Sequence, residues 1–403
     1  MALVPVAEAL ARILEQAKPL GIETVPLTES HGRVLAKDLM ALRTQPPADV
    51  SAMDGYAVRA ADVASVPSTL AIVGEVAAGR PVVSAIGPGQ AARIFTGGVV
   101  PAGADTIVIQ EHTERSGDRV IVKTAAAAGK HIRRAGIDFR TGDPLLTRGR
   151  RLTGRDVTLA AAANHAVLPV CRRPRVAMFA TGDELVMPGQ EPGPGQIVYS
   201  NGYAIMALAR AEGAEIIDLG VVPDRMDETM AALHRARETK ADVLVTTGGA
   251  SVGEYDLMHR AFTADGIALS FWKIALRPGR PLMHGRTGDM HALGLPGNPV
   301  SAFVCAFLFL VPLLRVLTGR AEVEHRIESL PVGCNLPAND ERADYLRATI
   351  NRSPAGQEVV TPWPVQDSSL MQVLAKADCL LIRPPKAPPA RAGDLCPVLK
   401  LPL

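Results

Sequence analysis

Residues 175–184 read RVAMFATGDE, an apolar run followed at once by a glycine and two carboxylates. The apolar part of this stretch, Arg175–Ala180, is typical of a β-strand. Three further strand-like runs follow, at Glu215–Val221, Asp242–Thr247 and His291–Leu295. The four runs therefore predict four strands.

Helical patterns separate these strands, near Gly202–Glu212, Asp227–Thr239 and Tyr255–Ala264. Strands that alternate with helices of 10–15 residues predict a doubly wound α/β domain. We place this domain at residues 171–322. Its longest apolar run, Val300–Leu314, contains Pro312 and is shorter than a bilayer span, so we expect a buried helix.

The remaining chain differs in texture from the α/β part. Residues 46–137 are rich in Gly, Pro and short β-branched runs, which predicts an inserted β-rich domain with strands at Leu70–Val76, Ala92–Phe95, Thr106–Gln110 and Val120–Lys123. Residues 1–45 and 138–170 flank it as one N-terminal linker domain, with helices in Met1–Leu20 and Gly154–Asn164. Residues 323–403 predict a small C-terminal β-barrel. The expected fold is α/β plus β, in an elongated multi-domain chain.

Composition excludes several classes of protein. The 403 residues carry 43 basic and 41 acidic side chains, a net charge of +2, and 47% are hydrophobic. This apolar content excludes disorder, and the near-zero charge argues against a general nucleic-acid binder. The five cysteines form no CxxC pair, and the N-terminus lacks a signal peptide. We expect a cytoplasmic protein with no membrane or nucleic-acid partner.

The loops after the four strands carry the candidate chemistry, because ligands of open α/β sheets bind outside the carboxyl ends of the strands. These loops are 181–184, 223–224, 248–256 and 295–301. Their glycines let backbone N–H groups approach an anion, and their carboxylates together suit a hard cation such as Mg²⁺. A single Asp in such a loop is more often a helix N-cap, but four loops of this kind favour a ligand site.

Standard motifs do not explain the Gly248–Gly253 loop. It lacks the Lys-Ser/Thr of a P-loop, which rejects a Walker-type NTPase. It also reads G-x-S-x-G, as in a hydrolase nucleophile elbow, but the following histidines, His284 and His291, leave little chain for an acid-bearing strand. The nine histidines include no HxxxH pair that would indicate a zinc hydrolase.

Seven segments in order resemble the MoeA family of molybdopterin molybdenumtransferases, which includes the E-domain of gephyrin. They are SAMDGYAVR (51–59), TGGVVPAGAD (96–105), IRRAGID (132–138), TGDEL (181–185), GGASVGEYD (248–256), FWKIALRPGRP (271–281) and GLPGNPVS (294–301). The resemblance spans nearly the whole chain. It implies Mg²⁺-dependent insertion of molybdate into adenylylated molybdopterin with release of AMP, by an elongated homodimer that dimerises through the linker domain.

The resemblance also assigns residues. It implies metal ligation by Glu184, Asp224 and Asp256. It implies catalytic roles for Asp54, Thr96, Arg133, Asp138, Lys273 and Arg277. It implies substrate contacts from Thr181, Gly248, Gly249, Ser251, Gly253, Pro296, Asn298, Pro299 and Ser368. In such a dimer, Asp54 of one subunit would act with Asp256 of the other.

Two departures from the family pattern stand out. Val50 occupies a position where Asn is usual, and Arg277 and Arg280 replace the lysines of the common KPGKP segment. Arginine keeps the charge and adds a bidentate fork, so we expect activity with altered anion geometry. A molybdopterin adenylyltransferase and a non-catalytic scaffold stay open as alternatives, as does tungstate in place of molybdate. The implied partners are a molybdopterin adenylyltransferase and the enzymes that accept the cofactor.

Overall fold

A six-stranded sheet lies in the α/β part of the computed structural model, which describes residues 3–79, 84–248, 257–353 and 356–402. Its strands, in spatial order, are β16 (Glu215–Val222), β13 (Arg175–Thr181), β17 (Val243–Thr247), β21 (Met290–Leu295), β20 (Met283–Thr287) and β18 (Ala268–Phe271). The first four are parallel and lie where the sequence predicts strands. The last two pair antiparallel and were not predicted. The sheet is therefore mixed rather than wholly parallel.

Helices cover both faces of this sheet. Side chains alternate along a strand, so Val176 and Met178 of β13 pack into one apolar cluster while Ala177 and Phe179 pack into another. The first cluster includes helix α3 (Asn201–Ala211), and the second includes α4 (Met226–Glu238) and α5 (Leu257–Ala264). The three helices lie at the predicted positions, and the two clusters give the doubly wound arrangement.

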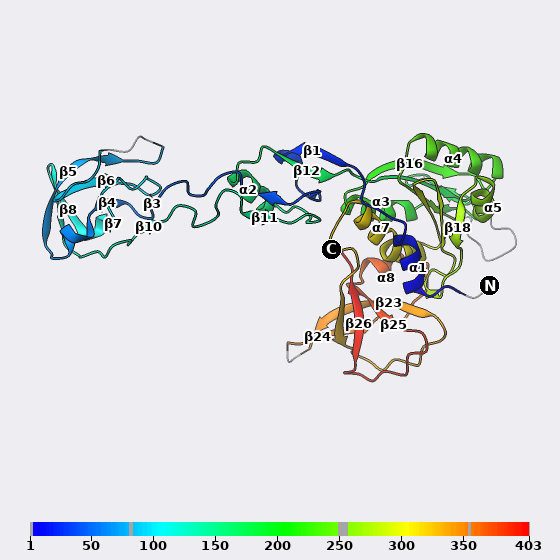
Figure 1. Cartoon of the computed structure of the whole chain (residues 1–403). Helices are drawn as coiled ribbons and strands as arrows, with labels where there is room; N and C mark the ends of the chain where they lie inside the picture. The colour runs from blue at the N-terminus through cyan, green and yellow to red at the C-terminus, as the bar shows by residue number, and fades with distance from the viewer. Residues whose placement is uncertain (1–2, 80–83, 249–256, 354–355, 403) are drawn as a thin grey trace.

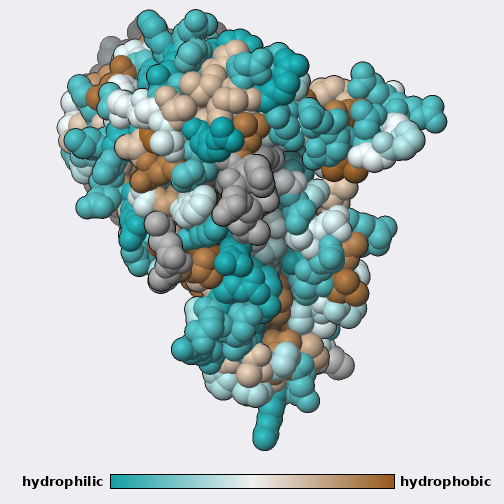
Figure 2. All heavy atoms as spheres, turned by 90° about the vertical axis from the view of Figure 1, so that its right-hand side faces the viewer, coloured by the Kyte–Doolittle hydropathy of each residue, from teal (hydrophilic) through white to brown (hydrophobic). Residues whose placement is uncertain are grey.

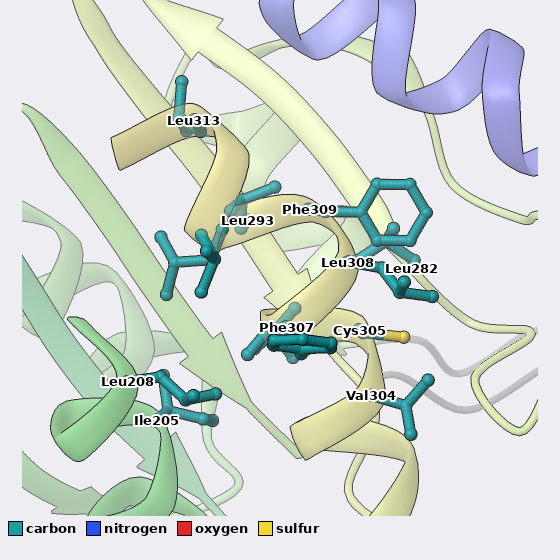
Figure 3. Close-up of a cluster of buried hydrophobic side chains, with 14 of the residues drawn as sticks. Ile205, Leu208, Leu282, Leu293, Val304, Cys305, Phe307, Leu308, Phe309 and Leu313 are labelled. Carbon is teal, nitrogen blue, oxygen red and sulfur yellow. The ribbon is translucent and has the colours of Figure 1, made fainter. Parts of the chain in front are cut away.

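The helical segment from Pro299 to Leu317 is the centre of the first cluster. It comprises α6 (Pro299–Cys305), a π-helical turn (Ala306–Leu310) and α7 (Val311–Leu317). Pro312 has no N–H and its ring would meet the Leu308 carbonyl, which accounts for the widened turn. Figure 3 shows this segment against side chains of α3 and β21, with Ile205, Leu208, Leu293, Phe307, Phe309 and Leu313 labelled.

The length of this segment corrects one prediction. Its 19 residues, with a hydropathy of 2.4, are enough to cross a membrane, so the argument from a short apolar run does not hold. Instead, 83% of its most apolar window is buried inside the protein, as in the core helix of a globular domain. The face shown in Figure 2 is mostly hydrophilic, with scattered apolar residues.

The chain extends away from the α/β part through a narrow middle section (Figure 1). This section contains the antiparallel pair of β1 (Ile22–Pro26) and β12 (Val167–Cys171), helix α2 (Gly154–Ala162), and β2 (Leu39–Met40) paired with β11 (Pro144–Leu146). Helix α1 (Val6–Leu14) lies outside the section and packs on the α/β part, where Ala9 and Ile13 are buried. Helix α1 is shorter than the predicted Met1–Leu20.

A second six-stranded sheet lies at the far end (Figure 1). Its strands are β7 (Thr106–Ile109), β4 (Gly55–Val58), β6 (Gln90–Ile94), β5 (Ser68–Val76), β9 (Arg119–Val122) and β8 (Thr113–Ser116). Beside it, β3 (Val50–Ser51) pairs with β10 (Ile132–Arg133). The four strands predicted between residues 70 and 123 all lie in this sheet.

A third sheet follows the α/β part. It joins β19 (Leu276–Arg277), β23 (Ala343–Arg352), β25 (Cys379–Arg383), β26 (Leu395–Lys400), β22 (Ile327–Pro331) and β24 (Glu358–Pro362), which pairs with β23. Strand β19 comes from the α/β segment of the chain, so this sheet is anchored to that part by backbone pairing.

Two buried histidines connect β20 and β21. His284 Nε2 and His291 Nδ1 are 3.2 Å apart, and the side chains are 2% and 1% exposed. Burial lowers the pKa of both imidazoles, and the Arg286 guanidinium lowers them further. Because the folded pKa values lie below the unfolded value of about 6.5, these residues stabilise the fold above that pH and cease to do so as the pH falls.

We therefore expect the α/β part to lose stability progressively below about pH 6.5, by about 1.4 kcal/mol per pH unit for each histidine that takes up a proton only on unfolding. Scanning calorimetry between pH 7.5 and 4.5 measures this slope. His284→Gln with His291→Gln should flatten it, whatever its effect at pH 7.5. An equally steep slope in the double variant would contradict the assignment.

Candidate active site

Three carboxylates meet at the carboxyl ends of β13 and β16. Asp183 and Glu184 follow β13 directly, and Asp224 follows β16. The backbone N–H of Asp224 donates to Asp183 Oδ1 at 3.1 Å, which joins the two loops. The parallel pairing of the strands brings these acids together at one edge of the sheet, as the sequence predicts for Glu184 and Asp224. We call this edge, with the loops that follow β13, β16, β17 and β21, the acidic edge. Asp183 was not predicted, although its place in the TGDE segment was a sufficient signal.

The pKa of the Asp224 carboxyl reflects its desolvation and the neighbouring carboxylates. Although the side chain reaches the surface, desolvation raises the pKa of its carboxyl, and the charges of Glu184 and Asp183 raise it further. The Thr181 hydroxyl, from the end of β13, opposes the shift. A cation placed between carboxylates that repel one another stabilises their charged forms. Among the described residues, however, no group of three His, Cys, Asp or Glu side chains could already hold a metal ion.

Gly248 ends β17 in a conformation that only glycine adopts readily. Its φ is +85°, and a Cβ there would lie 2.1 Å from the Thr181 carbonyl oxygen. Gly297, after β21, approaches Gly248 closely enough that its own Cβ would lie 3.6 Å from the Gly248 Cα. The two loops are thus in contact at the same edge as the acids. The predicted Gly249, Ser251, Gly253 and Asp256 lie outside the described residues.

The loop after β21 is tied to the C-terminal part of the chain. Asn298 Nδ2 donates to Ser368 Oγ at 3.0 Å, and the Val300 N–H donates to the Ser368 carbonyl at 3.1 Å. On the other side, Asn201 Nδ2 donates to the Gly297 carbonyl at 2.6 Å. The structure thus brings Ser368 to the predicted Asn298, between the buried Pro296 and the start of α6 at Pro299.

A buried arginine that the sequence did not predict contacts the residue before Ser368. Arg347 of β23 is 1% exposed, and its Nη2 donates to the Asp367 carbonyl at 2.9 Å. Its Nε has no hydrogen-bond partner within the described ranges, and desolvation lowers its pKa. A buried guanidinium that lacks a full set of acceptors is stabilised by an anion. No local pattern in its segment ADYLRATI, which also contains Asp344, distinguishes Arg347 in the sequence.

The basic residues of the 271–281 segment have different surroundings. Lys273 Nζ lies 4.3 Å from the ring centroid of Trp272. Arg277 lies opposite Asp344 in the pairing of β19 with β23, and its Nε donates to Asp344 Oδ1 at 2.6 Å while Nη1 donates to Asp340 at 3.1 Å. The guanidinium of Arg277 is therefore hydrogen-bonded to two carboxylates, which the sequence did not predict.

The second set of predicted residues lies at the far end. Asp54 Oδ1 accepts hydrogen bonds from the backbone N–H and the hydroxyl of Thr96, at 2.7 and 2.8 Å, and these bonds lower the pKa of its carboxyl. Arg133 lies in β10 and is exposed, and Asp138 is exposed near the end of the same segment. The structure thus joins Asp54 to Thr96 directly.

Within one chain, these residues do not meet the acids of the α/β part. Figure 1 shows the sheet of β4 and β6 at one end and the sheet of β13 and β16 at the other, with the middle section between them. Residues predicted for one site therefore form two separate groups in a single subunit.

The glycine requirement of the acidic edge can be tested. Gly248→Ala should lower the thermal unfolding midpoint by about 4 °C or more, because a left-handed non-glycine residue costs about 1–2 kcal/mol and the Thr181 carbonyl must also move. Gly297→Ala, whose Cβ meets only an ordinary contact, is the control and should change the midpoint little. Equal midpoints for the two variants would contradict the close approach.

Family models match three successive parts of the chain. The MoeA N-terminal region (domain I and II) matches residues 4–164, a probable molybdopterin binding domain matches 177–316, and the MoeA C-terminal region (domain IV) matches 329–401. Every residue that the structure brings to the acidic edge falls within the second or third of these matches, and Asp54 and Thr96 fall within the first.

Related proteins agree over the full length. Molybdopterin molybdenumtransferase 2 of Mycobacterium tuberculosis is 36% identical over 95% of both chains, and the molybdopterin molybdenumtransferase of Haemophilus influenzae is 33% identical over 96% of both. The crystal structure of a molybdopterin biosynthesis MoeA protein from Pyrococcus horikoshii superposes with a TM-score of 0.85 and 30% identity, covering 99% of both chains. The chain is therefore an enzyme of molybdenum cofactor biosynthesis and belongs to the MoeA family of molybdopterin molybdenumtransferases.

Proposed function

We propose that this enzyme inserts molybdate into adenylylated molybdopterin, with release of AMP, and that the reaction requires Mg²⁺. The observation that carries this proposal is the meeting of Glu184 and Asp224 with Gly248, Asn298 and Ser368 at one edge of the α/β sheet. A phosphorylated substrate needs backbone donors and a counter-charge, and a reactive oxyanion needs cationic side chains close by. The Gly248 and Gly297 loops would offer the backbone donors, the carboxylates would hold a Mg²⁺ counter-charge, and Lys273 and Arg277 would supply the cationic side chains.

The acidic edge fits Mg²⁺ by its donor chemistry. Asp183, Glu184 and Asp224 supply oxygen atoms only, and desolvation together with the two neighbouring carboxylates raises the pKa of Asp224. Mg²⁺ would neutralise phosphate oxygens and the charge that develops as AMP leaves. We propose Glu184 and Asp224, with Asp256, as its ligands, and Asp183 as the residue that fixes the Asp224 loop.

The chain's own residues would then hold the two substrates in place. The loops at Gly248 and Gly297 would bring backbone N–H groups to the phosphate, and Asn298 with Ser368 would fix the loop that encloses it. Lys273 and Arg277 would hold the molybdate oxyanion, because both are cationic side chains of the same segment, 271–281. The site thus orients and neutralises its substrates, and no side chain need act as a nucleophile.

We also propose that the working site is composite, in a homodimer. In one subunit Asp54 and Thr96 lie at the opposite end from Asp224, so a two-fold partner would have to bring its own far-end sheet to the acidic edge.

We retain the division into a linker domain (1–45 and 138–170), an inserted β-rich domain (46–137), an α/β domain (171–322) and a C-terminal β-barrel (323–403). We place the enzyme in the cytoplasm, with a molybdopterin adenylyltransferase and cofactor-accepting enzymes as partners.

The first test is the release of AMP from adenylylated molybdopterin, with and without molybdate, in excess Mg²⁺ or in EDTA. We expect release to depend on Mg²⁺, and Asp224→Asn to slow it at least about tenfold, because one charged metal ligand is lost. Asp227→Asn, which removes a largely exposed carboxylate in the first turn of α4, is the matched control. Full activity in EDTA would contradict the role of the metal, and consumption of ATP with molybdopterin would favour an adenylyltransferase.

The composite site is tested by mixing subunits. Asp54→Asn and Asp224→Asn should each abolish the reaction alone, and random mixing gives about half heterodimers. In each heterodimer one site combines intact Asp54 with intact Asp224, so about a quarter of the wild-type activity should return. A mixture that stays inactive after proven subunit exchange would rule out the shared site.

A further inference from the structure

A basic stretch of the middle section lies outside the site described above. Residues 148–155 read RGRRLTGR, with four arginines in eight residues. The stretch lies where the middle section joins the α/β part (Figure 1), and residues 147–153 face residues 320–322 across a cavity of about 530 Å³. Arg150, Arg151 and Arg320 line this cavity, together with His31 and the single carboxylate of Glu322.

Each of the three guanidinium groups uses only part of its donors on the protein. Arg150 donates from Nε and Nη2 to Asp156, at 2.9 and 2.8 Å. Arg151 donates from Nη2 to the Ala211 carbonyl at 2.6 Å and from Nε to the Gly32 carbonyl. Arg320 donates from Nη1 to Glu212 at 2.6 Å. Within the described ranges, one or more nitrogens of each group have no protein acceptor.

Charge at the cavity is not balanced by these contacts. Asp156 pairs with Arg150 and Glu212 is shared between Arg320 and Arg315, whereas Arg151 is bonded to carbonyl oxygens only. Desolvation lowers the pKa of Arg320. The Glu212 carboxylate raises this pKa, but the charges of Arg315 and Arg151 lower it further. Glu322 makes no ion pair with a described residue and is exposed. The cavity lining thus carries three guanidinium groups against one carboxylate, and an anion bound there would be attracted to it.

We propose that this cavity is a binding site for a phosphate-bearing small molecule, held by Arg150, Arg151 and Arg320. Guanidinium forks match a phosphate group geometrically, and three forks around one space can bind several of its oxygens. The volume exceeds what one inorganic phosphate fills and lies in the range of small-molecule sites. The site joins two parts of the chain, so its ligand would stabilise their relative position.

The test is calorimetric titration of the native full-length protein with inorganic phosphate, ribose 5-phosphate and ribose. We expect both phosphates to bind and ribose not to bind. Tighter binding of ribose 5-phosphate identifies an organic phosphate as the preferred ligand, and equal binding identifies the free anion. Binding of ribose as tight as that of its phosphate would overturn the proposal.

Two pairs of variants assign the binding to this cavity. Glu322→Gln should tighten phosphate binding about fivefold, because it removes the one lining carboxylate, while Glu324→Gln, two residues away and outside the cavity, should change it little. Arg151→Gln should weaken binding about tenfold, and Arg155→Gln, in the same basic stretch but not lining the cavity, should not. Equal effects within either pair would overturn the proposal, and the gain expected for Glu322→Gln cannot arise from misfolding.

Discussion

Parallel pairing of β13 with β16 and β17, and of β17 with β21, is the constraint on which the rest of this structure depends. It places the ends of four strands at one edge, so that loops separated by more than a hundred residues meet there. The Asp224 N–H bond to Asp183, the contact of Gly248 with Gly297 and the bond from Asn298 to Ser368 all lie along this edge. The apolar clusters on the two faces keep the strands in register, which in turn keeps these contacts in place.

How much the sequence predicts depends on whether a feature is local or rests on distant contacts. The four parallel strands and their helices were predictable, because buried runs, glycines and carboxylates recur in one order along the chain. The antiparallel strands β18 and β20 were not, because His284, Gly285 and Arg286 break the apolar pattern there. His284 is buried between Phe271 of β18 and His291 of β21, and no local pattern reveals these contacts.

The same distinction applies to the site. Glu184, Asp224 and Asn298 could be placed from the rule that ligands meet strand ends, together with the family resemblance. Arg347 could not, since its place beside the Asp367 carbonyl depends on the pairing of β23 in another sheet. Nor could the sequence show that Arg277 faces Asp344, because that contact follows from the register of β19 with β23. Residues whose contacts depend on the pairing of strands far apart in the chain could not be placed from the sequence.

The Arg277–Asp344 pair shows why the arginine in place of the common lysine has a structural consequence. Its fork binds both oxygens of Asp344 and also reaches Asp340, whereas a lysine ammonium would act as a single point charge. Asp344 is largely buried and lies three residues before Arg347 on the same strand. The pair therefore fixes β23 against the α/β part, and β23 carries the guanidinium that holds the Ser368 loop. A side chain expected to bind the substrate thus also sets the position of the neighbouring sheet that completes the acidic edge.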